Sequence, residues 1–299
     1  MARTGLFELN AVVAVSTHRS FRRAAAELGL SPSALSHAIA TLEQRMGVRL
    51  FNRTTRSVSL SEAGEQFLAR VQPALREIAG AMETINDFRD KPAGTLRINT
   101  SEGAAQMVMR PMVVEFLRRY PEMQLDLVTE GRPADIVAEG FDAGIRIDES
   151  VPQNMMKVSC SPLLRFAVVG SPAYFGRHPR PRAPADLGGH SCIRMRFPGR
   201  AVLKWEFEKR GEALAVDVNG PLILDSHHLL IEAAVEGLGL AWTSEFAVRE
   251  ELADGRLVRV LEDWTPSYPG LCLYYPGHRH VPAGLRAFIS LIREAMAQE

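Results

Sequence analysis

The stretch from Ser20 to Met46 predicts two short helices joined by a tight turn, and it constrains the fold more than any other part of the chain. In its first half, apolar side chains recur at the spacing of one helical face, with Ser20 as the N-cap. Gly29 can take the left-handed conformation that ends a helix. Ser31 and Pro32 then begin the second helix, because proline at the first helical position forfeits no hydrogen bond.

The second helix has two different faces. One face is apolar and predicts the burial of Leu35, Ala38, Ile39, Leu42 and Met46. The other face is small or hydrogen-bonding and consists of Ser33, Ser36, His37, Ala40 and Gln44. A helix with such an outer face can enter the major groove of DNA and reach base edges. The stretch also fits an ordinary antiparallel helix pair, and these residues alone leave both interpretations open.

The formal net charge of zero conceals an uneven distribution. Residues 1–60 contain eight arginines against three glutamates, a net charge of +5, so the rest of the chain carries −5. A basic first part attached to an acidic body is typical of a polyanion-binding module joined to another domain.

A first helix and a hairpin are predicted on either side of this helix pair. The segment from Leu6 to Val15 has apolar side chains on one helical face and would complete a three-helix head. Residues 49–51 and 57–60 alternate as strands do, with residues 52–56 as the connecting loop. The loop carries two arginines and two threonines, which suit phosphate or minor-groove contacts, so we interpret the hairpin as a wing.

Four motifs, SFRRAAAEL, SALSHAIATLE, GVRLFNRTTR and SEAGE, follow one another in a long ungapped run. In this order they resemble the N-terminal DNA-binding domain of LysR-type transcriptional regulators. The resemblance implies a winged helix-turn-helix domain over residues 4–61, with the helix-turn-helix at 21–40. One departure concerns Pro32-Ser33 and His37, where many family members have Gln-Pro and Arg. The mode of binding carries over from the family, whereas the operator sequence does not.

The helix face, the wing and the resemblance together predict the residues that contact DNA. His37 can donate a hydrogen bond to a guanine acceptor or to a phosphate, although an isolated histidine would be a plain surface residue. The wing arginines are expected to position the head on the phosphates and not to specify the sequence. The predicted set is Ser31, Ser33, Ser36, His37, Gln44, Arg53, Thr54 and Arg56.

A long helix is predicted from Ser61 to Phe88. Its apolar residues are spaced alternately by three and four positions, which is a heptad seam and not a broad core-facing stripe. Such a seam requires a partner helix, and the resemblance implies the same pairing. Residues 62–89 are therefore predicted to pair two chains into a homodimer. The homodimer would bind a double-stranded DNA site of approximate twofold symmetry. Pro73 lies inside the helix and should bend or destabilise it. The seam residues are Leu68, Val71, Leu75, Ile78, Met82 and Ile85.

Beyond a polar hinge at residues 89–94, the pattern changes to alternating strands and helices, which predicts parallel sheets with right-handed crossovers. The segments PADIVAEGFDAGIRI and LLRFAVVGSPAYF resemble the effector-binding domain of the same family, which is similar to type 2 periplasmic binding proteins. The predicted fold class is α+β multidomain, with an all-α winged helix-turn-helix head, a long linker helix and a two-lobed α/β domain over residues 92–299. Lobe I is predicted at 92–160 and 267–299, and lobe II at 163–263.

An effector site is predicted where strands of the α/β domain lead into helices. Open α/β folds bind ligands beyond the carboxyl ends of strands, where helix N-termini favour anions. Hydroxyl and backbone N–H groups at one such turn could hold a carboxylate, and by resemblance Arg146 and residues 225–227 should face the same cleft. Helix capping is the alternative role at the turn, and a salt bridge or surface position is the alternative for the others. The predicted effector-binding residues are Thr100, Ser101, Gly103, Arg146, Ser226 and His227.

No catalytic, cofactor or metal motif occurs in the sequence. Gly237 and Gly239 lack a third glycine and follow a helix, which argues against a dinucleotide site. Cys160, Cys192 and Cys272 show no disulfide or zinc spacing, so buried structural thiols are favoured over a redox-sensing pair. No apolar run reaches the ~18 residues of a membrane span and no signal peptide begins the chain, so we expect a cytoplasmic protein without a membrane partner.

The sequence therefore predicts a transcriptional regulator, not an enzyme, that binds a small and possibly anionic effector. The family resemblance implies that the effector changes the closure of the two lobes, and that dimers associate into a homotetramer that spaces and bends the DNA. The alternative is a solute-binding or enzymatic α/β protein with an accessory helical head. The absence of a catalytic constellation and the division of charge argue against this alternative.

Overall fold

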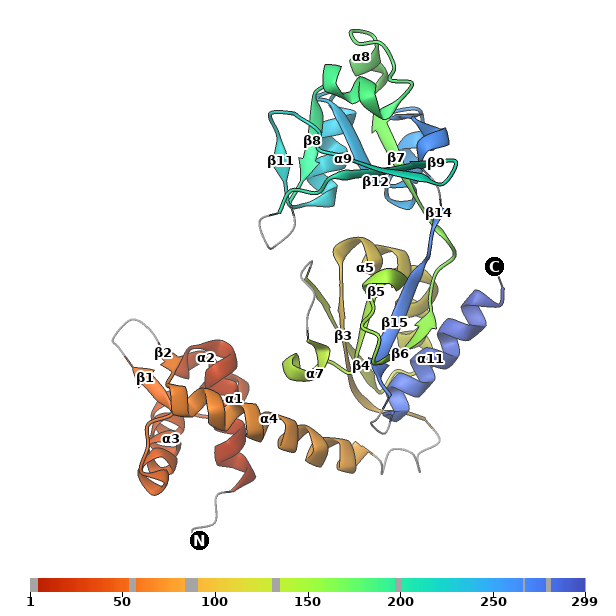
Figure 1. The fold of residues 1–299 in the computed structure, drawn as a ribbon. Helices are drawn as coiled ribbons and strands as arrows, with labels where there is room; N and C mark the ends of the chain where they lie inside the picture. The colour runs from red at the N-terminus through yellow and green to blue at the C-terminus, as the bar shows by residue number, and fades with distance from the viewer. Residues whose placement is uncertain are drawn as a thin grey trace. The chain divides into compact units, whose positions relative to one another are not determined.

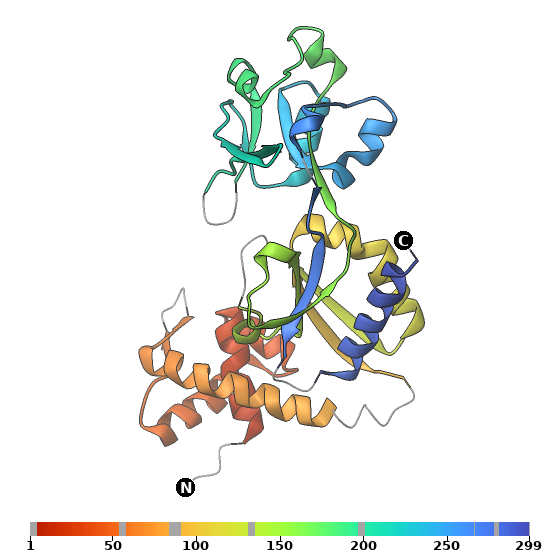
Figure 2. The same cartoon turned by 45° about the vertical axis from the view of Figure 1, so that its right-hand side comes forward.

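The computed structural model describes residues 5–53, 58–83, 91–130, 135–196, 201–265, 267–277 and 281–298. Its internal contacts divide the chain into two compact units, Met1–Arg89 and Asp90–Glu299. The first unit is mainly helical, and the second contains two large sheets with helices on their faces and a separate two-stranded hairpin (Figures 1 and 2).

The first unit combines a helical core with a small hairpin. The helix pair predicted from Ser20 to Met46 is present, and the hairpin follows it directly. Apolar side chains of the helices and the hairpin form one core, in which Val12, Leu35 and Leu50 are fully buried. The elements are α1 (Leu6–His18), α2 (Phe21–Glu27), α3 (Pro32–Met46), β1 (Phe51–Arg53), β2 (Val58–Leu60) and α4 (Glu62–Glu83).

Local sequence determines where the two helices of the pair begin and end. Ser20 accepts a hydrogen bond from a backbone N–H of the first turn of α2, and Ser31 does the same for α3 at 3.2 Å. Gly29 lies in the turn with φ of 66°, a conformation that other residues rarely adopt. Gly47 ends α3 in the same way, with φ of 70°.

Helix α4 begins at a close contact with the hairpin. The Ser61 hydroxyl donates to the carbonyl of Arg49 at 2.6 Å and accepts from the N–H of Gly64 at 3.0 Å. A Cβ on Gly64 would lie 2.1 Å from the carbonyl oxygen of Leu50, so only glycine fits there. The helix then continues through Pro73 to the end of the described segment.

The first sheet of the second unit has the strand order β4-β3-β5-β15-β6. β3 pairs in parallel with β4 and β5, whereas β15 pairs antiparallel with β5 and β6. Pro111 lies in a π-helical segment, η2, between α5 and α6. The elements are β3 (Gly94–Thr100), α5 (Glu102–Val108), η2 (Met109–Val114), α6 (Glu115–Arg119), β4 (Met123–Thr129), α7 (Ile136–Glu139), β5 (Ala143–Ile147), η3 (Asp148–Ser150), β6 (Met155–Ser159), β15 (Leu271–Pro276) and α11 (Ala283–Met296).

The second sheet has the order β11-β8-β12-β7-β13, and β14 also pairs with β7. Side chains of α9 such as Leu230 join a core with the sheet, and a separate core contains Trp205 and Trp242. The elements are β7 (Leu164–Gly170), α8 (Pro172–Phe175), η4 (Pro184–Gly189), β8 (Cys192–Met195), the hairpin β9 (Trp205–Lys209) and β10 (Glu212–Val216), β11 (Ile223–Leu224), α9 (His227–Val235), β12 (Leu240–Ser244), η5 (Glu245–Val248), α10 (Arg249–Ala253), β13 (Val258–Val260), η6 (Glu262–Trp264) and β14 (Ser267–Tyr268).

The chain passes between the two sheets twice, from β6 to β7 and from β14 to β15 (Figure 1). The two passages touch: the Ser161 hydroxyl accepts the N–H of Leu271 at 2.7 Å, and a Cβ on Gly270 would lie 2.3 Å from the carbonyl oxygen of Pro162. β14 lies in the range predicted for lobe I, yet it pairs with β7 of the second sheet. The return to the first sheet therefore follows Tyr268.

Candidate functional site

The hydrogen-bonding face of α3 is accessible to a partner. Ser33, His37 and Gln44 are exposed, and Ser36 is half-buried. Ser31 also lies at the helix start, where its hydroxyl caps the helix and lies 3.0 Å from the Ser33 hydroxyl. The predicted DNA-contacting side chains of α3 therefore share one face of the helix. The hydroxyls of Ser31 and Ser33 are within hydrogen-bonding distance of each other.

Glu43 of α3 holds the base of the hairpin. Its Oε1 accepts the backbone N–H groups of Leu50 at 2.8 Å and Phe51 at 3.0 Å. Its Oε2 accepts a hydrogen bond from Nη2 of Arg53 at 3.2 Å. Only 13% of the Glu43 side chain is exposed, so these donors replace water around the carboxylate. This carboxylate therefore fixes the start of β1 against α3.

Arg53 is engaged by three parts of the head at once. Besides its ion pair with Glu43, its Nη1 donates to the Ser36 hydroxyl at 3.0 Å. Its guanidinium carbon lies 4.4 Å from the ring centroid of Phe21 of α2, a cation–π distance. The predicted phosphate contact of Arg53 stays a prediction, and these intramolecular contacts compete with it. Thr54 and Arg56 lie outside the described residues.

The heptad seam of α4 lies partly in contact with the head. Leu68 is half-buried and packs on the head core, whereas Ile78 is 43% exposed. Val71 and Leu75 are half-buried. Met82 lies in the helix, and Ile85 falls outside the described residues. The exposed Ile78 is the seam residue that this chain leaves uncovered within the described part of α4.

The turn between β3 and α5 contains the first group of predicted effector residues. The Ser101 hydroxyl caps α5 by accepting the N–H of Ala104 at 3.3 Å, so the capping role is present. Thr100 is fully buried and its hydroxyl donates to the carbonyl of Ser101 at 3.3 Å. No atom lies within 4 Å of the position of a Cβ on Gly103, so there is open space beside this turn.

Arg146 connects the ends of neighbouring strands in the first sheet. Its Nη2 donates to the side-chain oxygen of the fully buried Asn99 and, at 3.1 Å, to the carbonyl of Glu130. Its Nη1 donates to the carbonyl of Ile145 at 2.8 Å. Burial lowers the pKa of Arg146, and the nearby Tyr274 and Glu130 raise it, with a net lowering. These bonds make Arg146 a structural connection between β3, β4 and β5.

Ser226 and His227 lie at the N-terminus of α9. Ser226 is the N-cap residue, but its side chain makes no capping hydrogen bond. Burial lowers the pKa of His227, which the nearby Glu102 carboxylate partly offsets. His227 is therefore neutral near pH 7.

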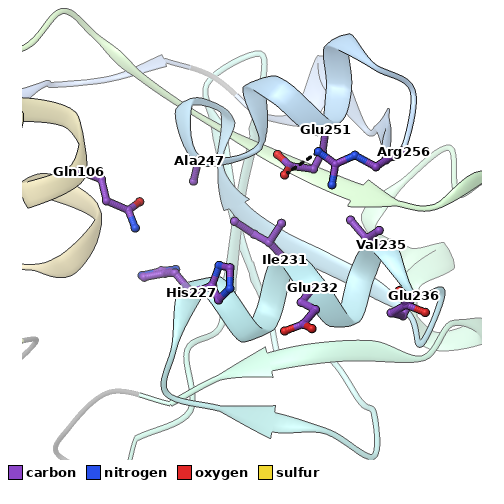
Figure 3. Close-up of a pocket in the computed structure, with 10 residues that line it drawn as sticks. Gln106, His227, Ile231, Glu232, Val235, Glu236, Ala247, Glu251 and Arg256 are labelled. Carbon is purple, nitrogen blue, oxygen red and sulfur yellow. Dashed lines mark hydrogen bonds and ion pairs between the residues drawn. The ribbon is translucent and has the colours of Figure 1, made fainter. Parts of the chain in front are cut away.

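A cavity of about 370 Å³ lies beside this helix, between α9, α10 and Gln106 of α5 (Figure 3). Ile231 and Val235 supply an apolar stripe along α9, and Figure 3 shows the ion pair of Glu251 and Arg256 on the opposite wall. The structure thus brings His227 together with Gln106, which the sequence did not single out.

No group of three or more His, Cys, Asp or Glu side chains in the described residues is arranged to hold a metal ion. Cys160, Cys192 and Cys272 are buried free thiols, and burial raises their pKa values to about 12, 12 and 11. A thiol of raised pKa is a poor nucleophile, which favours the structural interpretation over redox sensing. Within the described segments, no helix has the length and apolar character needed to cross a membrane.

Two residues that hold predicted site residues in place, Glu43 and Asn99, were not predicted from the sequence. Glu43 reads as an ordinary polar residue of a helix, because its partners on β1 lie seven to ten residues away along the chain. Asn99 lies inside an apolar strand pattern and is fully buried. In the sequence, the only sign of its role is an amide side chain among apolar residues. Its Nδ2 has no hydrogen-bond partner within the described structure.

Comparison with known families identifies both units. Residues 6–65 match the family of bacterial regulatory helix-turn-helix proteins of the lysR type, and residues 89–297 match the LysR substrate binding domain. The HTH-type transcriptional regulator YcaN of Escherichia coli strain K12 is 42% identical over 291 residues, which cover 97% of this chain and 95% of that protein.

Solved structures give the same result. The full-length Vibrio cholerae virulence activator AphB is 26% identical with a TM-score of 0.69, covering 97% of this chain and 99% of that one. CrgA from Neisseria meningitidis, a LysR-type transcriptional regulator, is 28% identical with a TM-score of 0.60, covering 98% of this chain and 99% of that one. The similarity therefore extends over both units of the chain.

Proposed function

This chain belongs to the LysR family of transcriptional regulators, and on this premise we propose how it reads DNA and senses a ligand. The family binds DNA through the helix-turn-helix domain and small effectors through the substrate-binding domain. The relatives are transcriptional regulators, not enzymes, so an enzymatic role for the α/β domain is set aside.

In the proposed mode of binding, α3 enters the major groove and the hairpin contacts the neighbouring backbone. Ser33, Ser36, His37 and Gln44 would contact base edges, and the wing would contact phosphates. The single observation that supports this best is the exposed polar face of α3 beside a hairpin attached to it by Glu43. The net charge of +5 on residues 1–60 adds attraction to DNA of any sequence.

The oligomer in this proposal is a homodimer through α4 that further pairs into a homotetramer. An exposed Ile78 on a heptad seam supports the dimer, because an apolar side chain on a long helix gains from a partner helix. Two heads related by a twofold axis would read an operator of approximate twofold symmetry. Since the DNA target of a bacterial regulator is cytoplasmic, we place the protein there as well.

The effector in this proposal is a small molecule with an anionic group, bound near the starts of α5 and α9. Three features support this location: the Ser226 hydroxyl, which makes no capping hydrogen bond, the Ser101 hydroxyl, and the open space at Gly103. Arg146 would support the site by holding the strand ends together. Binding would change the closure of the two lobes and, through the oligomer, the spacing and bending of the bound DNA.

A mobility-shift experiment tests the DNA-binding half of the proposal. The protein should bind the DNA upstream of its own coding region with site selectivity and strong salt dependence. His37→Ala should change the sequence preference, because base contacts specify and phosphate contacts do not. Binding that is no stronger than to unrelated DNA, for the wild-type protein, would contradict the proposal.

Thermal shifts across a panel of small carboxylates test the effector half. A true effector should raise the melting temperature of the wild-type protein by an amount that grows with the logarithm of its concentration above the dissociation constant. Ser101→Ala should reduce that shift, and Glu212→Gln, at an exposed position of β10, should leave it intact. Equal shifts in the wild type and Ser101→Ala would place the ligand elsewhere.

A further inference from the structure

The ion pair between Glu43 and Arg53 cancels a positive charge beside α3, the proposed reading helix. Arg53 follows the buried Phe51 on β1 and immediately precedes the wing tip. Its two terminal nitrogens are both engaged, with Oε2 of Glu43 at 3.2 Å and with the Ser36 hydroxyl at 3.0 Å. The guanidinium also lies 4.4 Å over the ring of Phe21.

We propose that Glu43 and Arg53 form a positioning clamp that directs the Ser36 hydroxyl toward DNA and withholds the charge of Arg53 from the phosphates. This inference deepens the proposed DNA-binding function and rests on it. Glu43 and Arg53 are positioning residues: they act through Ser36 and through the hairpin, and neither supplies the specific contact itself.

The effect on Ser36 follows from hydroxyl chemistry. A serine hydroxyl has one hydrogen to donate and two lone pairs that accept. The N–H of Arg53 occupies one lone pair, so the Ser36 hydrogen turns away from the guanidinium. Ser36 then meets the DNA as a donor, which suits the acceptors of the major groove, namely guanine O6 and N7, adenine N7 and thymine O4.

The effect on Arg53 follows from its neighbours. An arginine paired with a carboxylate adds little to the electrostatic attraction for DNA phosphates, because the pair is neutral as a whole. It therefore adds little to the salt dependence of binding. Glu43 keeps the carboxylate in place through the N–H groups of Leu50 and Phe51, at 2.8 and 3.0 Å. Loss of the carboxylate charge would therefore release Arg53 to any phosphate within reach, and the released charge would not distinguish one sequence from another.

The test compares the full-length wild-type protein with Arg53→Gln, Glu43→Gln and the double variant. Affinity for a selected operator and for random duplex DNA is measured at several salt concentrations, with thermal melting as the check on folding. Glu43→Gln/Arg53→Gln keeps the pair neutral, so it should lower operator affinity about fivefold, the value of a lost hydrogen bond, and leave both random-DNA affinity and the salt slope unchanged. Arg53→Gln alone leaves the Glu43 carboxylate unpaired, so it should also weaken binding to random DNA. Glu43→Gln should make the salt slope steeper by about one and raise random-DNA affinity.

The double variant and a matched arginine complete the design. If Arg53 acts through Glu43 and Ser36, the double variant should lose no more operator selectivity than Arg53→Gln alone. Arg49→Gln, at an exposed arginine without the clamp, serves as the reference for a freely solvated charge.

Two results would overturn the clamp. A salt slope that becomes shallower by about one in the double variant, with equal losses on operator and random DNA, would make Arg53 an ordinary phosphate contact. An unchanged slope in a folded Glu43→Gln would show that the carboxylate withholds no charge. If Glu43→Gln does not fold, Arg53→Gln and Ser36→Ala still test the clamp. Both variants should then show a lower ratio of operator affinity to random-DNA affinity than the wild type. A wild-type protein without any operator selectivity would instead refute the proposed function itself.

Discussion

At the scale of single residues, the environment of a side chain decides its role more than its type does. Arg53 and Arg146 are both cations at predicted ligand sites, and the structure gives both of them intramolecular partners. Arg53 is held by Glu43 and Ser36, and Arg146 joins Asn99 to two backbone carbonyls. Guanidinium groups with several donors readily serve as such structural connections.

His227 gives a pH prediction at the same scale. Burial lowers its pKa in the folded protein below the ordinary value near 6.5, so the unfolded chain binds the proton more readily. By linkage, stability is fully present above that ordinary value and falls as the pH drops through it. His227→Gln should therefore lose less stability than the wild type between about pH 7.5 and 5.5, measured by urea unfolding.

The control for this prediction is the adjacent residue. His228→Gln changes an exposed side chain and should keep the pH dependence of the wild type. Identical pH profiles for His227→Gln and the wild type would refute the role of burial at His227.

The sequence predicted these residues unevenly. Ser33, His37 and Gln44 lie on α3 and Ser31 caps it, as expected, because a cap and a helical face follow from spacing within one element. The contacts of Arg53 with Ser36 and Glu43 depend on how the hairpin packs against α3. Such contacts depend on tertiary geometry, and no spacing rule contains them.

At the scale of elements, the joint between the hairpin and α4 sets the direction in which the linker helix leaves the head. Gly64 makes this joint possible, since a Cβ there would lie 2.1 Å from the Leu50 carbonyl oxygen. The SEAGE motif is thus explained by packing: Ser61 caps the helix and Gly64 permits the close approach.

Gly64→Ala should destabilise the head by about 1–3 kcal/mol, because the backbone must shift to accommodate the methyl group. Denaturant unfolding followed by circular dichroism measures this loss. Glu65→Ala, at the next and exposed position, should stay within about 0.5 kcal/mol of the wild type. A Gly64→Ala protein as stable as the wild type would show that the contact is easily relieved.

The seam of α4 gives the second prediction for an element. Ile78→Glu should weaken dimerisation on the order of tenfold or more, since a charge would be buried in an apolar helix pair. Sedimentation equilibrium measures the dissociation constant. Ala69→Glu introduces the same charge at an exposed position of the same helix, on the face away from the seam, and should leave dimerisation unchanged. Equal effects of the two variants would argue against the seam.

At the scale of the whole molecule, the α/β domain contains two large sheets, and the chain crosses from one to the other twice. The alternation of strands and helices predicted the parallel pairing of β3 with β4 and β5. It did not predict the antiparallel pairing of β15 or the position of the second passage. A strand as short as β14 gives no periodic signal, and its pairing with β7 follows from tertiary structure.

The contact between the two passages predicts a coupling between stability and closure. Gly270→Ala would bring a Cβ to 2.3 Å from the Pro162 carbonyl oxygen and force the passages apart. We expect a loss of about 1–3 kcal/mol and a smaller effector-induced thermal shift. Gly188→Ala, where a Cβ meets no atom within 4 Å, is the control and should behave as the wild type. An unchanged ligand response in Gly270→Ala would exclude the passages from lobe closure.

The central claim is that two copies of the head read a twofold DNA site through α3. Selection of bound sequences from a random library of DNA duplexes, using the full-length protein, tests it most directly. We predict enriched sequences with two inverted half-sites whose centres are about one helical turn, or a multiple of it, apart. Enriched sequences without inverted symmetry, or no enrichment over the starting library, would contradict the claim.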